Sequence, residues 1–428
     1  MTGKKEILPI NTGCQTYHIW TIGCQMNRAE SERLEVRLAA CGYSAASGAN
    51  NADLIIVNSC VVRQRAEDKV VNKLHNLKAL KRDRPHMRIA LTGCFVGEDI
   101  EALRKQFPYV DDFFPPGEIP EWLNGENCLI LPERAAISVY VPIIQGCNNF
   151  CTYCIVPYRR GREKSRPLTE IITEVRQLAA GGVKEVTLVG QTVDSYGHDL
   201  PDKPDLADLL SEINDIEGLL RLRFLTNHPK DMSPRLIEAM ARLSKVCRQV
   251  NLPVQAGDDT VLKAMRRGYT VEQYRDLVRR LREAMPDIAI TTDLIVGFPG
   301  ETDEQFKNSY DLMAELKFDA IHIAAYSPRA GTKAALLPDT VPPEVKKSRL
   351  AAIEQLEEGI ARGINATLIG QTVSVLVEGN DKNRWRGRTR HDKIVFFSGD
   401  GGLVGKEVDV IIEHATAWSL VGKLSQAG

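Results

Sequence analysis

Residues 146–154 read Gly-Cys-Asn-Asn-Phe-Cys-Thr-Tyr-Cys, and this stretch decides the interpretation of the whole chain. Three thiolates spaced C-x3-C-x2-C, at Cys147, Cys151 and Cys154, can bind three irons of a four-iron cluster and leave the fourth iron open. An open iron can take a small molecule, whereas an electron-transfer cluster normally has four cysteine ligands. The alternatives are a zinc knuckle or three unrelated thiols. Zinc sites usually add a second cysteine pair or histidines, and the first downstream histidine is His198, so the spacing favours a catalytic cluster.

The bulk composition is that of an ordinary globular protein. The chain has 428 residues, 43% apolar and 26% charged, with a net charge of -1. Contact with nucleic acid would therefore have to come from local basic patches. The N-terminus has no apolar signal run, and no segment approaches the length of a membrane span. We therefore expect a cytoplasmic protein without membrane contact, whose cysteines bind metal or react more often than they form disulfides.

The middle of the chain alternates between strand-like and helix-like segments. The apolar strand-like runs are 138–144, 185–189, 222–225, 249–254, 288–296 and 320–325. Helix-like stretches lie between them, at 169–180, 234–243, 271–284 and 303–316. Six strands with crossovers predict a partial parallel (β/α)6 barrel over 135–365, including a charged helical linker over 342–365.

Function in such barrels lies in the loops that follow the strands, and the unusual residues of this chain fall there. The cysteine stretch follows the first strand, Gln191 the second, and Thr226-Asn227-His228-Pro229 the third. Gln255 and Asp258 follow the fourth strand, and the turn from Gly297 to Glu301 follows the fifth. Any one of these could be a turn or a helix cap. Their recurrence at successive strand ends indicates a shared active-site face.

Upstream, residues 16–130 predict an open parallel α/β sheet. Strand-like segments at 17–22, 53–58 and 88–91 alternate with helix-like segments at 29–40, 65–80 and 99–106. Cys24, Cys60 and Cys94 each follow one of these strands, 36 and 34 residues apart. Strand ends of a parallel sheet share one edge, so we expect these thiols to converge as a second cluster site. The alternative is that they are buried core cysteines, which is the interpretation we adopt for Cys41, Cys128 and Cys247, while Cys14 is left unassigned.

The last 63 residues, 366–428, predict a small all-β barrel. Short strands are expected at 371–378, 394–397, 406–413 and 419–424, joined by glycine-rich turns. Between the first two lies a basic run over 382–393 with six Lys or Arg against one Asp, including Arg384, Trp385, Arg386, Arg388 and Arg390. A second basic run follows the cysteine stretch and contains Arg159, Arg160 and Arg162. Each run could be a solvated loop, but together they favour an RNA partner.

The chain resembles the radical S-adenosylmethionine (SAM) methylthiotransferases over nearly its whole length, and the MiaB branch most of all. The motifs that carry this resemblance are 23–27 (Gly-Cys-Gln-Met-Asn), 165–167 (Ser-Arg-Pro), 252–255 (Leu-Pro-Val-Gln), 265–270 (Met-Arg-Arg-Gly-Tyr-Thr) and 326–329 (Tyr-Ser-Pro-Arg). The resemblance implies a methylthiotransferase domain over 16–130, a radical-SAM barrel over 135–365 and a TRAM domain over 366–428. It also implies two [4Fe-4S] clusters, one on each cysteine triad, and SAM as cofactor.

The resemblance further implies an enzymatic reaction on tRNA. The family attaches a methylthio group to C2 of N6-isopentenyladenosine next to the anticodon, through a radical made at the Cys147, Cys151 and Cys154 cluster and sulfur carried at the other. In such an enzyme we expect Tyr153 near the SAM adenine and Arg266 on its carboxylate. We expect SAM or the target base to contact Gln191, Gln255, Asp258, Gly297 and Glu301.

Other substrates and other classes of protein remain open on sequence grounds. Related enzymes methylthiolate threonylcarbamoyl-adenosine in tRNA or an aspartate of a ribosomal protein. A plain iron–sulfur electron carrier or a zinc-containing RNA-binding protein would be a different class altogether. For the enzyme we expect a monomer whose partners are the anticodon stem-loop of tRNA and an electron donor such as a flavodoxin or ferredoxin, with a sulfur donor that the sequence does not specify.

Overall fold

The computed structural model describes residues 15–62, 64–97, 99–123, 136–381 and 384–425. Cys14, Cys128 and the first two residues of the basic run over 382–393 lie outside the described residues. The chain forms two compact units. The first contains residues up to 134 together with 155–162, and the second contains 135–154 and 163–428. No described helix is both long enough and apolar enough to cross a membrane.

The first unit is an all-parallel five-stranded sheet in the order β2-β1-β3-β4-β5. Its strands are β1 (Thr16–Thr21), β2 (Ser44–Ala45), β3 (Leu54–Ser59), β4 (Arg88–Gly93) and β5 (Asp112–Phe113). The three central strands are those expected from the sequence. The two edge strands were not predicted, because a two-residue strand has no periodicity to recognise.

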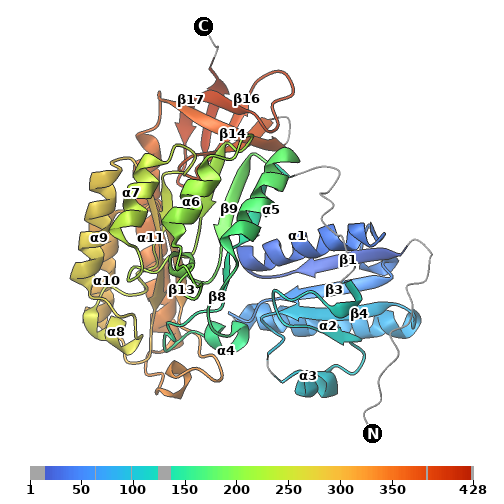
Figure 1. The fold of residues 1–428 in the computed structure, drawn as a ribbon. Helices are drawn as coiled ribbons and strands as arrows, with labels where there is room; N and C mark the ends of the chain where they lie inside the picture. The colour runs from blue at the N-terminus through green and yellow to red at the C-terminus, as the bar shows by residue number, and fades with distance from the viewer. Residues whose placement is uncertain (1–14, 63, 98, 124–135, 382–383, 426–428) are drawn as a thin grey trace. The chain divides into compact units, whose positions relative to one another are not determined.

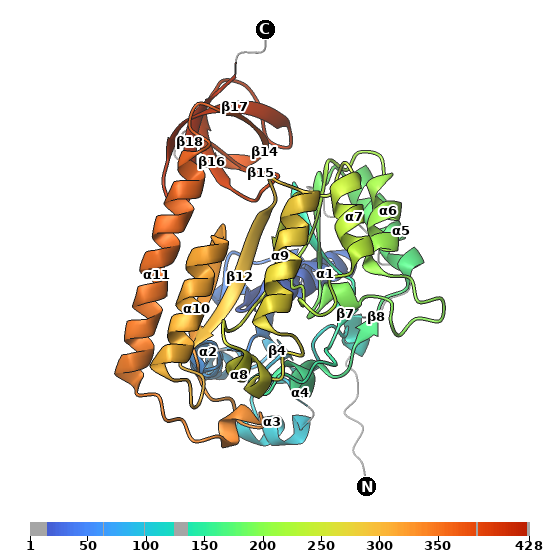
Figure 2. The same cartoon turned by 90° about the vertical axis from the view of Figure 1, so that its left-hand side faces the viewer.

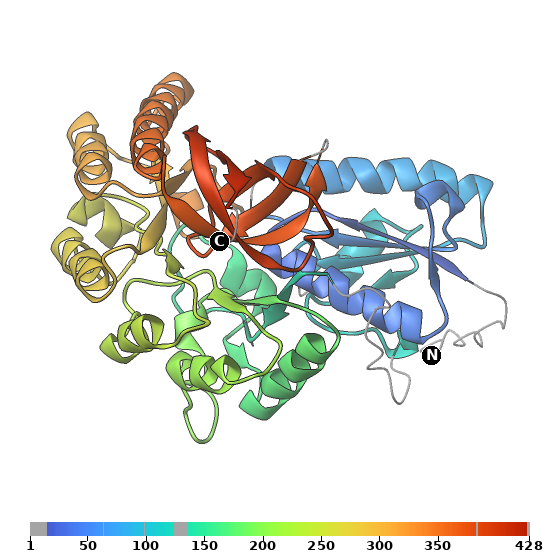
Figure 3. The same cartoon turned by 90° about the horizontal axis from the view of Figure 1, so that it is seen from above.

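Helices cover both faces of this sheet. They are α1 (Gln25–Ala40), α2 (Gln64–Asp83) and α3 (Ile100–Gln106), with short 3-10 turns at Ala49–Asn51 and Glu121–Leu123. Alternate residues of β3 enter different cores, since Ile56 packs with Leu34 and Leu38 of α1 whereas Val57 packs with the α2 side. Figure 3 shows α1 and α2 on opposite faces of the sheet. Because β1, β3 and β4 are parallel, all three strands end at the same edge of the sheet.

The second unit contains the six expected parallel strands. They are β6 (Ser138–Pro142), β9 (Glu185–Val189), β10 (Arg221–Phe224), β11 (Gln249–Asn251), β12 (Ala289–Val296) and β13 (Ala320–Ala325). They form two three-stranded sheets, β6-β9-β10 and β11-β12-β13, joined by one parallel bridge from Leu222 to Val246. A short antiparallel pair, β7 (Ile144–Gln145) and β8 (Lys164–Ser165), follows β6. The predicted partial (β/α)6 barrel is confirmed.

The helices of this barrel cover its outer side (Figure 2). They are α5 (Leu168–Ala180), α6 (Leu206–Asn214), α7 (Pro234–Arg242), α8 (Asp259–Ala264), α9 (Val271–Ala284) and α10 (Asp303–Leu316). Capping boxes begin α9 at Thr270 with Gln273 and α10 at Thr302 with Gln305. Short 3-10 turns lie at Val193–Ser195 and Ala334–Leu336, and α4 (Val156–Arg160) belongs to the first unit.

The chain leaves the barrel through α11 (Pro343–Ala366) and ends in a closed five-stranded barrel. Its strands are β14 (Thr372–Asp381), β15 (Arg384–Thr389), β16 (Ile394–Ser398), β17 (Glu407–Ala415) and β18 (Leu420–Leu424). The expected all-β barrel is confirmed, with one correction. The basic run was predicted to be a loop, but most of its described part is strand β15. Gly387 and Thr389 of β15 are buried while Arg386 and Arg388 are partly exposed, so alternation along the strand keeps the charges on its outer face.

Two buried arginines attach the small barrel to the strands of the large one. Arg221, at the start of β10 and fully buried, forms a 2.7 Å ion pair with Glu407 and donates to the carbonyl of Arg388 at 2.6 Å. Arg223 pairs with Glu185 at 3.0 Å and donates to the carbonyl of Thr389 at 2.7 Å. The small barrel thus sits at the ends where the parallel strands begin (Figure 1). The loops that follow the strands lie at the opposite end.

Candidate active site

The three cysteines of the first unit converge at the edge where β1, β3 and β4 end. Cys24 is the N-cap residue of α1 and is exposed, whereas Cys60 and Cys94 are buried. A β-carbon on Gly23, beside Cys24, would lie 3.0 Å from the β-carbon of Cys60. Burial raises the pKa of the Cys94 thiol to about 11, Arg160 opposes this, and the nearby Cys60 and Cys24 thiols raise it further. The expected convergence of these thiols is therefore present.

A buried amide network holds two of these cysteine loops together. Asn27 accepts a hydrogen bond from the Cys24 backbone N–H at 3.2 Å, and its own amide donates to Asn58 at 2.9 Å and to the carbonyl of Ser59 at 3.1 Å. Asn58 in turn donates to the carbonyl of Asn27 at 2.8 Å. Because both amides are fully buried, each lost bond would leave an unsatisfied polar group. The network therefore fixes the loop after β1 against the end of β3.

The third loop approaches β3 through Gly93. This glycine has a φ of +87°, and a β-carbon there would lie 2.3 Å from the carbonyl oxygen of Ser59. The next amide, that of Cys94, donates to the same carbonyl at 2.7 Å. Only glycine permits both the left-handed backbone and this close approach. The approach places Cys94 beside the loop that carries Cys60.

Arg160 lies directly against the Cys94 thiol. Its Nε–H donates to Cys94 Sγ at 3.1 Å, and its two terminal nitrogens pair with both oxygens of Glu30 on α1 at 2.5 and 3.2 Å. The side chains of Arg160 and Glu30 are 1% and 6% exposed. Arg160 was expected to contact RNA, but its guanidinium is enclosed, so it does not present a surface to a phosphate. Glu30 was not predicted as a partner of Arg160, because no local sequence pattern indicates this pairing.

The cysteine stretch of the second unit is held by residues from the neighbouring strand end. Gln191, after β9, accepts the backbone N–H of Gly146 at 2.6 Å. Cys147 Sγ lies 3.5 Å from the Thr192 hydroxyl and accepts the Asn149 N–H at 3.5 Å. Burial raises the pKa of the Cys147 thiol, and these two contacts lower it. Gln191 therefore lies where it was expected, and its amide oxygen supports the loop itself.

A second buried arginine lies against this triad. Arg267 donates to Cys151 Sγ at 3.3 Å, to the carbonyl of Pro253 at 2.9 Å and to the Tyr153 hydroxyl at 3.5 Å. Burial alone would lower the pKa of Arg267, but Tyr153, Tyr269 and Cys151 raise it. Arg266, the residue expected on the SAM carboxylate, is exposed and has a φ of +59°. The contact of Arg266 with SAM stays a prediction, and it is the next residue, Arg267, that lies against the cysteines.

Polar side chains without partners point to a ligand near the third strand end. Asp194 accepts the backbone N–H of His228 at 2.9 Å and the Asn227 amide at 3.4 Å. Burial raises the pKa of Asp194 to about 8, and it lowers the pKa of His228, together with Arg267 and Lys230, to about 2. Asn227 Oδ1 and His228 Nε2 are buried without any hydrogen-bond partner. Such atoms fit a bound polar molecule.

The other residues that were expected to contact SAM or the target base also stabilise the local structure. Gln255 is half-buried with a φ of +74°. Asp258 caps α8 and also accepts from Asn308 at 3.0 Å. Gly297 has a φ of +71° and donates its N–H to Glu301 at 2.6 Å, while Glu301 pairs with Arg349 of α11 at 2.6 Å. Glu301 Oε1 is buried without a partner, so this turn retains one acceptor for a ligand.

The donor chemistry of both triads fits a four-iron cluster, because each triad consists of cysteine thiols and such clusters are held by cysteine thiolates. Among the described residues, no three His, Cys, Asp or Glu side chains are placed to hold one metal ion. Each triad also has a buried arginine that donates to one sulfur. Such a donor stabilises a thiolate ligand.

The arginines expected at RNA differ in exposure. Arg162 is exposed, and Arg159 is half-buried with its guanidinium so close to Gly97 that a β-carbon there would lie 2.2 Å away. Arg384 is exposed and stacks on Phe396 at 5.3 Å, and Arg386 retains a 44% exposed side chain.

The other three residues expected at RNA make intramolecular contacts. Arg388 pairs with Glu378 and Asp392, Arg390 donates to the carbonyl of Val246 at 3.0 Å, and the Trp385 indole donates to that of Gly399 at 2.8 Å.

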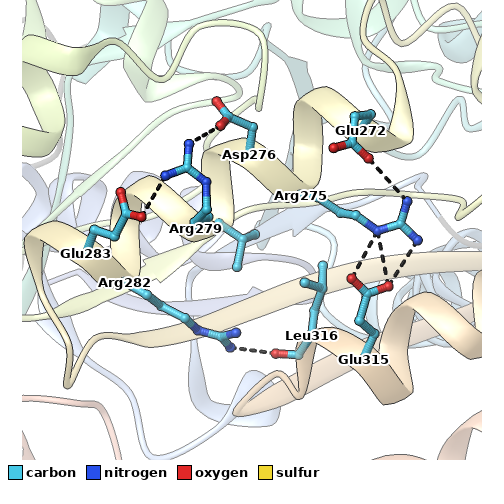
Figure 4. A pocket seen from close by; sticks show the side chains of 9 residues that line it. Glu272, Arg275, Asp276, Arg279, Arg282, Glu283, Glu315 and Leu316 are labelled. Carbon is cyan, nitrogen blue, oxygen red and sulfur yellow. Dashed lines mark hydrogen bonds and ion pairs between the residues drawn. The ribbon is translucent and has the colours of Figure 1, made fainter.

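A separate depression lies on the outer side of α9 and α10. It has a volume of about 480 Å³, and Figure 4 shows that its lining is a set of ion pairs. Arg275 pairs with Glu315 at 3.0 Å and Arg279 with Glu283 at 2.6 Å. No cysteine lines it. The depression is a salt-bridged helix surface rather than part of the active-site face.

Three family models match the chain in sequence order. Residues 16–115 match the uncharacterized protein family UPF0004, residues 141–313 the radical SAM superfamily, and residues 366–425 the TRAM domain. The matches follow the sheet unit, the large barrel and the small barrel.

Similar proteins include several named tRNA-2-methylthio-N(6)-dimethylallyladenosine synthase. One from Dehalococcoides mccartyi is 58% identical over 95% of this chain and 98% of its own length. Others, from Chloroflexus aurantiacus and Thermoanaerobacter sp., are 50% and 44% identical over 95% and 98% of this chain and 91% and 95% of their own.

Among solved structures, the radical SAM methyltransferase TsrM from Kitasatospora setae, with cobalamin and a [4Fe-4S] cluster bound, has a TM-score of 0.54 at 16% identity. The match covers 76% of this chain and 77% of that one. The cobalamin-dependent radical enzyme OxsB gives 0.51 at 11% identity, covering 80% and 56%. These structures share the fold.

Proposed function

This chain belongs to the tRNA-2-methylthio-N(6)-dimethylallyladenosine synthase family of radical-SAM enzymes, and we propose that it attaches sulfur and a methyl group to C2 of N6-isopentenyladenosine next to the anticodon. The observation that carries this is the presence of two separate cysteine triads, each at the strand ends of its own parallel sheet. One triad suits radical initiation and the other suits sulfur donation. An electron carrier would need neither the second open site nor the polar strand ends.

The cofactors of the family are SAM and [4Fe-4S] clusters. When bound, they supply what side chains cannot, namely a radical that removes hydrogen from an aromatic carbon and sulfur to replace it. Cys147, Cys151 and Cys154 are the proposed ligands of one cluster. Cys24, Cys60 and Cys94 are the proposed ligands of the other. Acid–base residues alone would not suffice, because the hydrogen on C2 is not acidic at neutral pH.

The protein's own part is to hold and orient these groups. Arg267 donates to Cys151 and so keeps one thiolate in place, while Gln191 fixes the backbone of the same loop. His228 stays neutral, since its pKa is about 2, and offers its unpartnered Nε2 to a ligand. Asn227 offers a carbonyl oxygen beside it. A neutral pair of this kind suits the polar edge of an adenine or of SAM.

RNA contact is assigned to the arginines with exposed side chains, chiefly Arg384 and Arg386 of the small barrel and Arg162 after the cysteine stretch, with the half-buried Arg159 beside it. The small barrel lies where the strands of the large barrel begin, and the eight-residue β12 alone spans about 26 Å. A base treated at the opposite strand ends must therefore belong to an RNA long enough to reach past the barrel. A folded tRNA stem-loop meets this condition better than a single nucleotide.

We also propose an electron donor, an oligomeric state and a cellular compartment. A small electron-transfer protein such as a flavodoxin or ferredoxin reduces the radical-SAM cluster, and the enzyme works as a monomer in the cytoplasm. The domain roles follow the predicted ranges, with residues 16–130 holding the sulfur-donating cluster, 135–365 the SAM site and 366–428 the RNA surface.

The test separates the two triads. Cys151→Ala should abolish SAM cleavage, whereas Cys60→Ala should keep cleavage and lose sulfur insertion. Iron and sulfide analysis after anaerobic reconstitution should give about eight irons per wild-type chain and about four in each variant. Methylthio product from Cys60→Ala would contradict the division of labour. Mass spectrometry of tRNA nucleosides with and without the gene identifies the substrate, and loss of a threonylcarbamoyl-adenosine product instead would overturn the choice of base.

A further inference from the structure

The arginine that touches the first unit's cysteine triad comes from an unexpected part of the chain. Arg160 ends α4, only six residues after Cys154 of the other triad, yet residues 155–162 pack as part of the first unit. Its Nε–H donates to Cys94 Sγ at 3.1 Å. The segment directly after one cysteine motif thus supplies a buried cation to a thiol of the other.

The cation is closely compensated. Both oxygens of Glu30 accept from the terminal nitrogens of Arg160, and the two side chains are almost fully enclosed. Removing one partner of such a pair leaves a buried charge, but the intact pair gives little net stability compared with apolar packing. A contribution to folding stability therefore does not explain why the Nε–H of Arg160 donates to the sulfur of Cys94.

We propose that Arg160 is a positioning residue that tunes the reduction potential of the cluster on Cys24, Cys60 and Cys94 through its hydrogen bond to Cys94, and that Glu30 opposes it. The inference rests on the proposed function, which places a cluster at these cysteines. Hydrogen bonds to the sulfurs and nearby charge set the potential of an iron–sulfur cluster. A cation favours the reduced, more negative cluster and raises the potential, and a neighbouring carboxylate lowers it again.

The other triad also has a buried arginine that donates to one of its sulfurs. Arg267 donates to Cys151 at 3.3 Å and is buried, and among the described residues its charged-group neighbours are Tyr153, Tyr269 and Cys151 rather than a carboxylate. The two arginines therefore differ in their partners: Arg160 has the buried carboxylate Glu30, whereas the carboxylate near the other triad, Glu163, acts on the Cys147 thiol and not on Arg267. Two clusters with the same ligand type are in this way given different potentials, as two different chemical roles require.

The experiment isolates one cluster. In a chain carrying Cys147→Ala, Cys151→Ala and Cys154→Ala, the remaining iron is titrated with reductant and followed by electron paramagnetic resonance. Arg160→Gln should lower the midpoint potential and Glu30→Gln should raise it. Arg160→Lys keeps the charge and should stay close to the parent value. Arg84→Gln, which removes a surface ion pair with Asp53 in the same unit, is the matched control and should leave the potential unchanged.

Opposite signs for Arg160→Gln and Glu30→Gln distinguish tuning from a structural role, which would broaden the signal or lose iron in both. If Arg160→Gln fails to load iron, Glu30→Gln should still raise the midpoint potential, while Arg160→Lys should leave it close to the parent value. Shifts of the same sign, or no shift beyond the Arg84→Gln control, would overturn the inference alone. A parent chain that binds no iron would overturn the proposed second cluster as well.

Discussion

Replacing Gly93 by alanine should destabilise the first unit and empty its cysteine site. Two terms add. The φ of +87° costs an L-residue about 1–2 kcal/mol, and a β-carbon 2.3 Å from the Ser59 carbonyl forces the strands apart at a further cost of about 1–3 kcal/mol. The sum is about 2–5 kcal/mol, which is large for a unit of this size.

Two other glycines of the same unit separate these terms. Gly42 has a φ of +83° with nothing within 4 Å of an added β-carbon, so Gly42→Ala carries the backbone term alone. Gly48 has extended backbone with a φ of 175° and equally open space, so Gly48→Ala should change little. The steric term is then the difference between the Gly93→Ala and Gly42→Ala chains, about 1–3 kcal/mol.

Amide hydrogen exchange of the β3 and β4 strands measures the effect within the unit. Since 1.4 kcal/mol is a factor of ten, exchange should quicken roughly 30-fold to a few thousandfold in Gly93→Ala and about 5- to 30-fold in Gly42→Ala. Gly93→Ala should also lose about four irons, because Cys94 is the next residue. Equal exchange rates in the two chains, or full iron content in Gly93→Ala, would refute the steric argument.

Three further outcomes are expected. Arg221→Met leaves buried carbonyls without a donor and should weaken tRNA binding in a gel-shift assay while SAM cleavage in the absence of tRNA persists, whereas Glu407→Gln should have a milder effect because Glu407 is 30% exposed. Arg267→Met should reduce iron loading at Cys151 and shift the SAM-perturbed resonance signal, with the other cluster unchanged. Asp194, with a pKa near 8 against 3.8 when unfolded, is protonated in the folded state, so its contribution to stability should fall as pH rises from about 4 to 8, and Asp194→Asn should remove this slope in denaturant titrations.

Local patterns were enough for most of the elements. The predicted helices over 271–284 and 303–316 are reproduced as α9 and α10 with the same bounds, because capping boxes mark their first turns within the sequence. The predicted strands over 185–189 and 320–325 are likewise β9 and β13.

Strand β15 was missed for a physical reason. Its outward residues are charged, and its inward residues include Gly387 and Thr389, so the run lacks the apolar alternation that marks a strand. It becomes a strand because β14 and β16 supply partners on both sides.

Part of the candidate site was also predictable from the sequence, and part was not. Spacing alone predicted where the two triads lie, because each cysteine follows a strand and parallel strands end together. Spacing could not show that Arg267 is buried against Cys151, because that depends on the left-handed backbone at the preceding residue, Arg266. No pattern showed that Arg160 is buried, because its partner Glu30 is 130 residues away.

The sequence by itself determined the positions of the two cysteine triads along the chain, the order of the folding units and the family, all of which depend on residue types at short, regular spacings. Only the tertiary structure decided which charges face solvent and which face a thiol. That decision depends on long-range pairing: a guanidinium is buried only where distant residues satisfy its donors, as Glu30 does for Arg160 and Glu407 for Arg221.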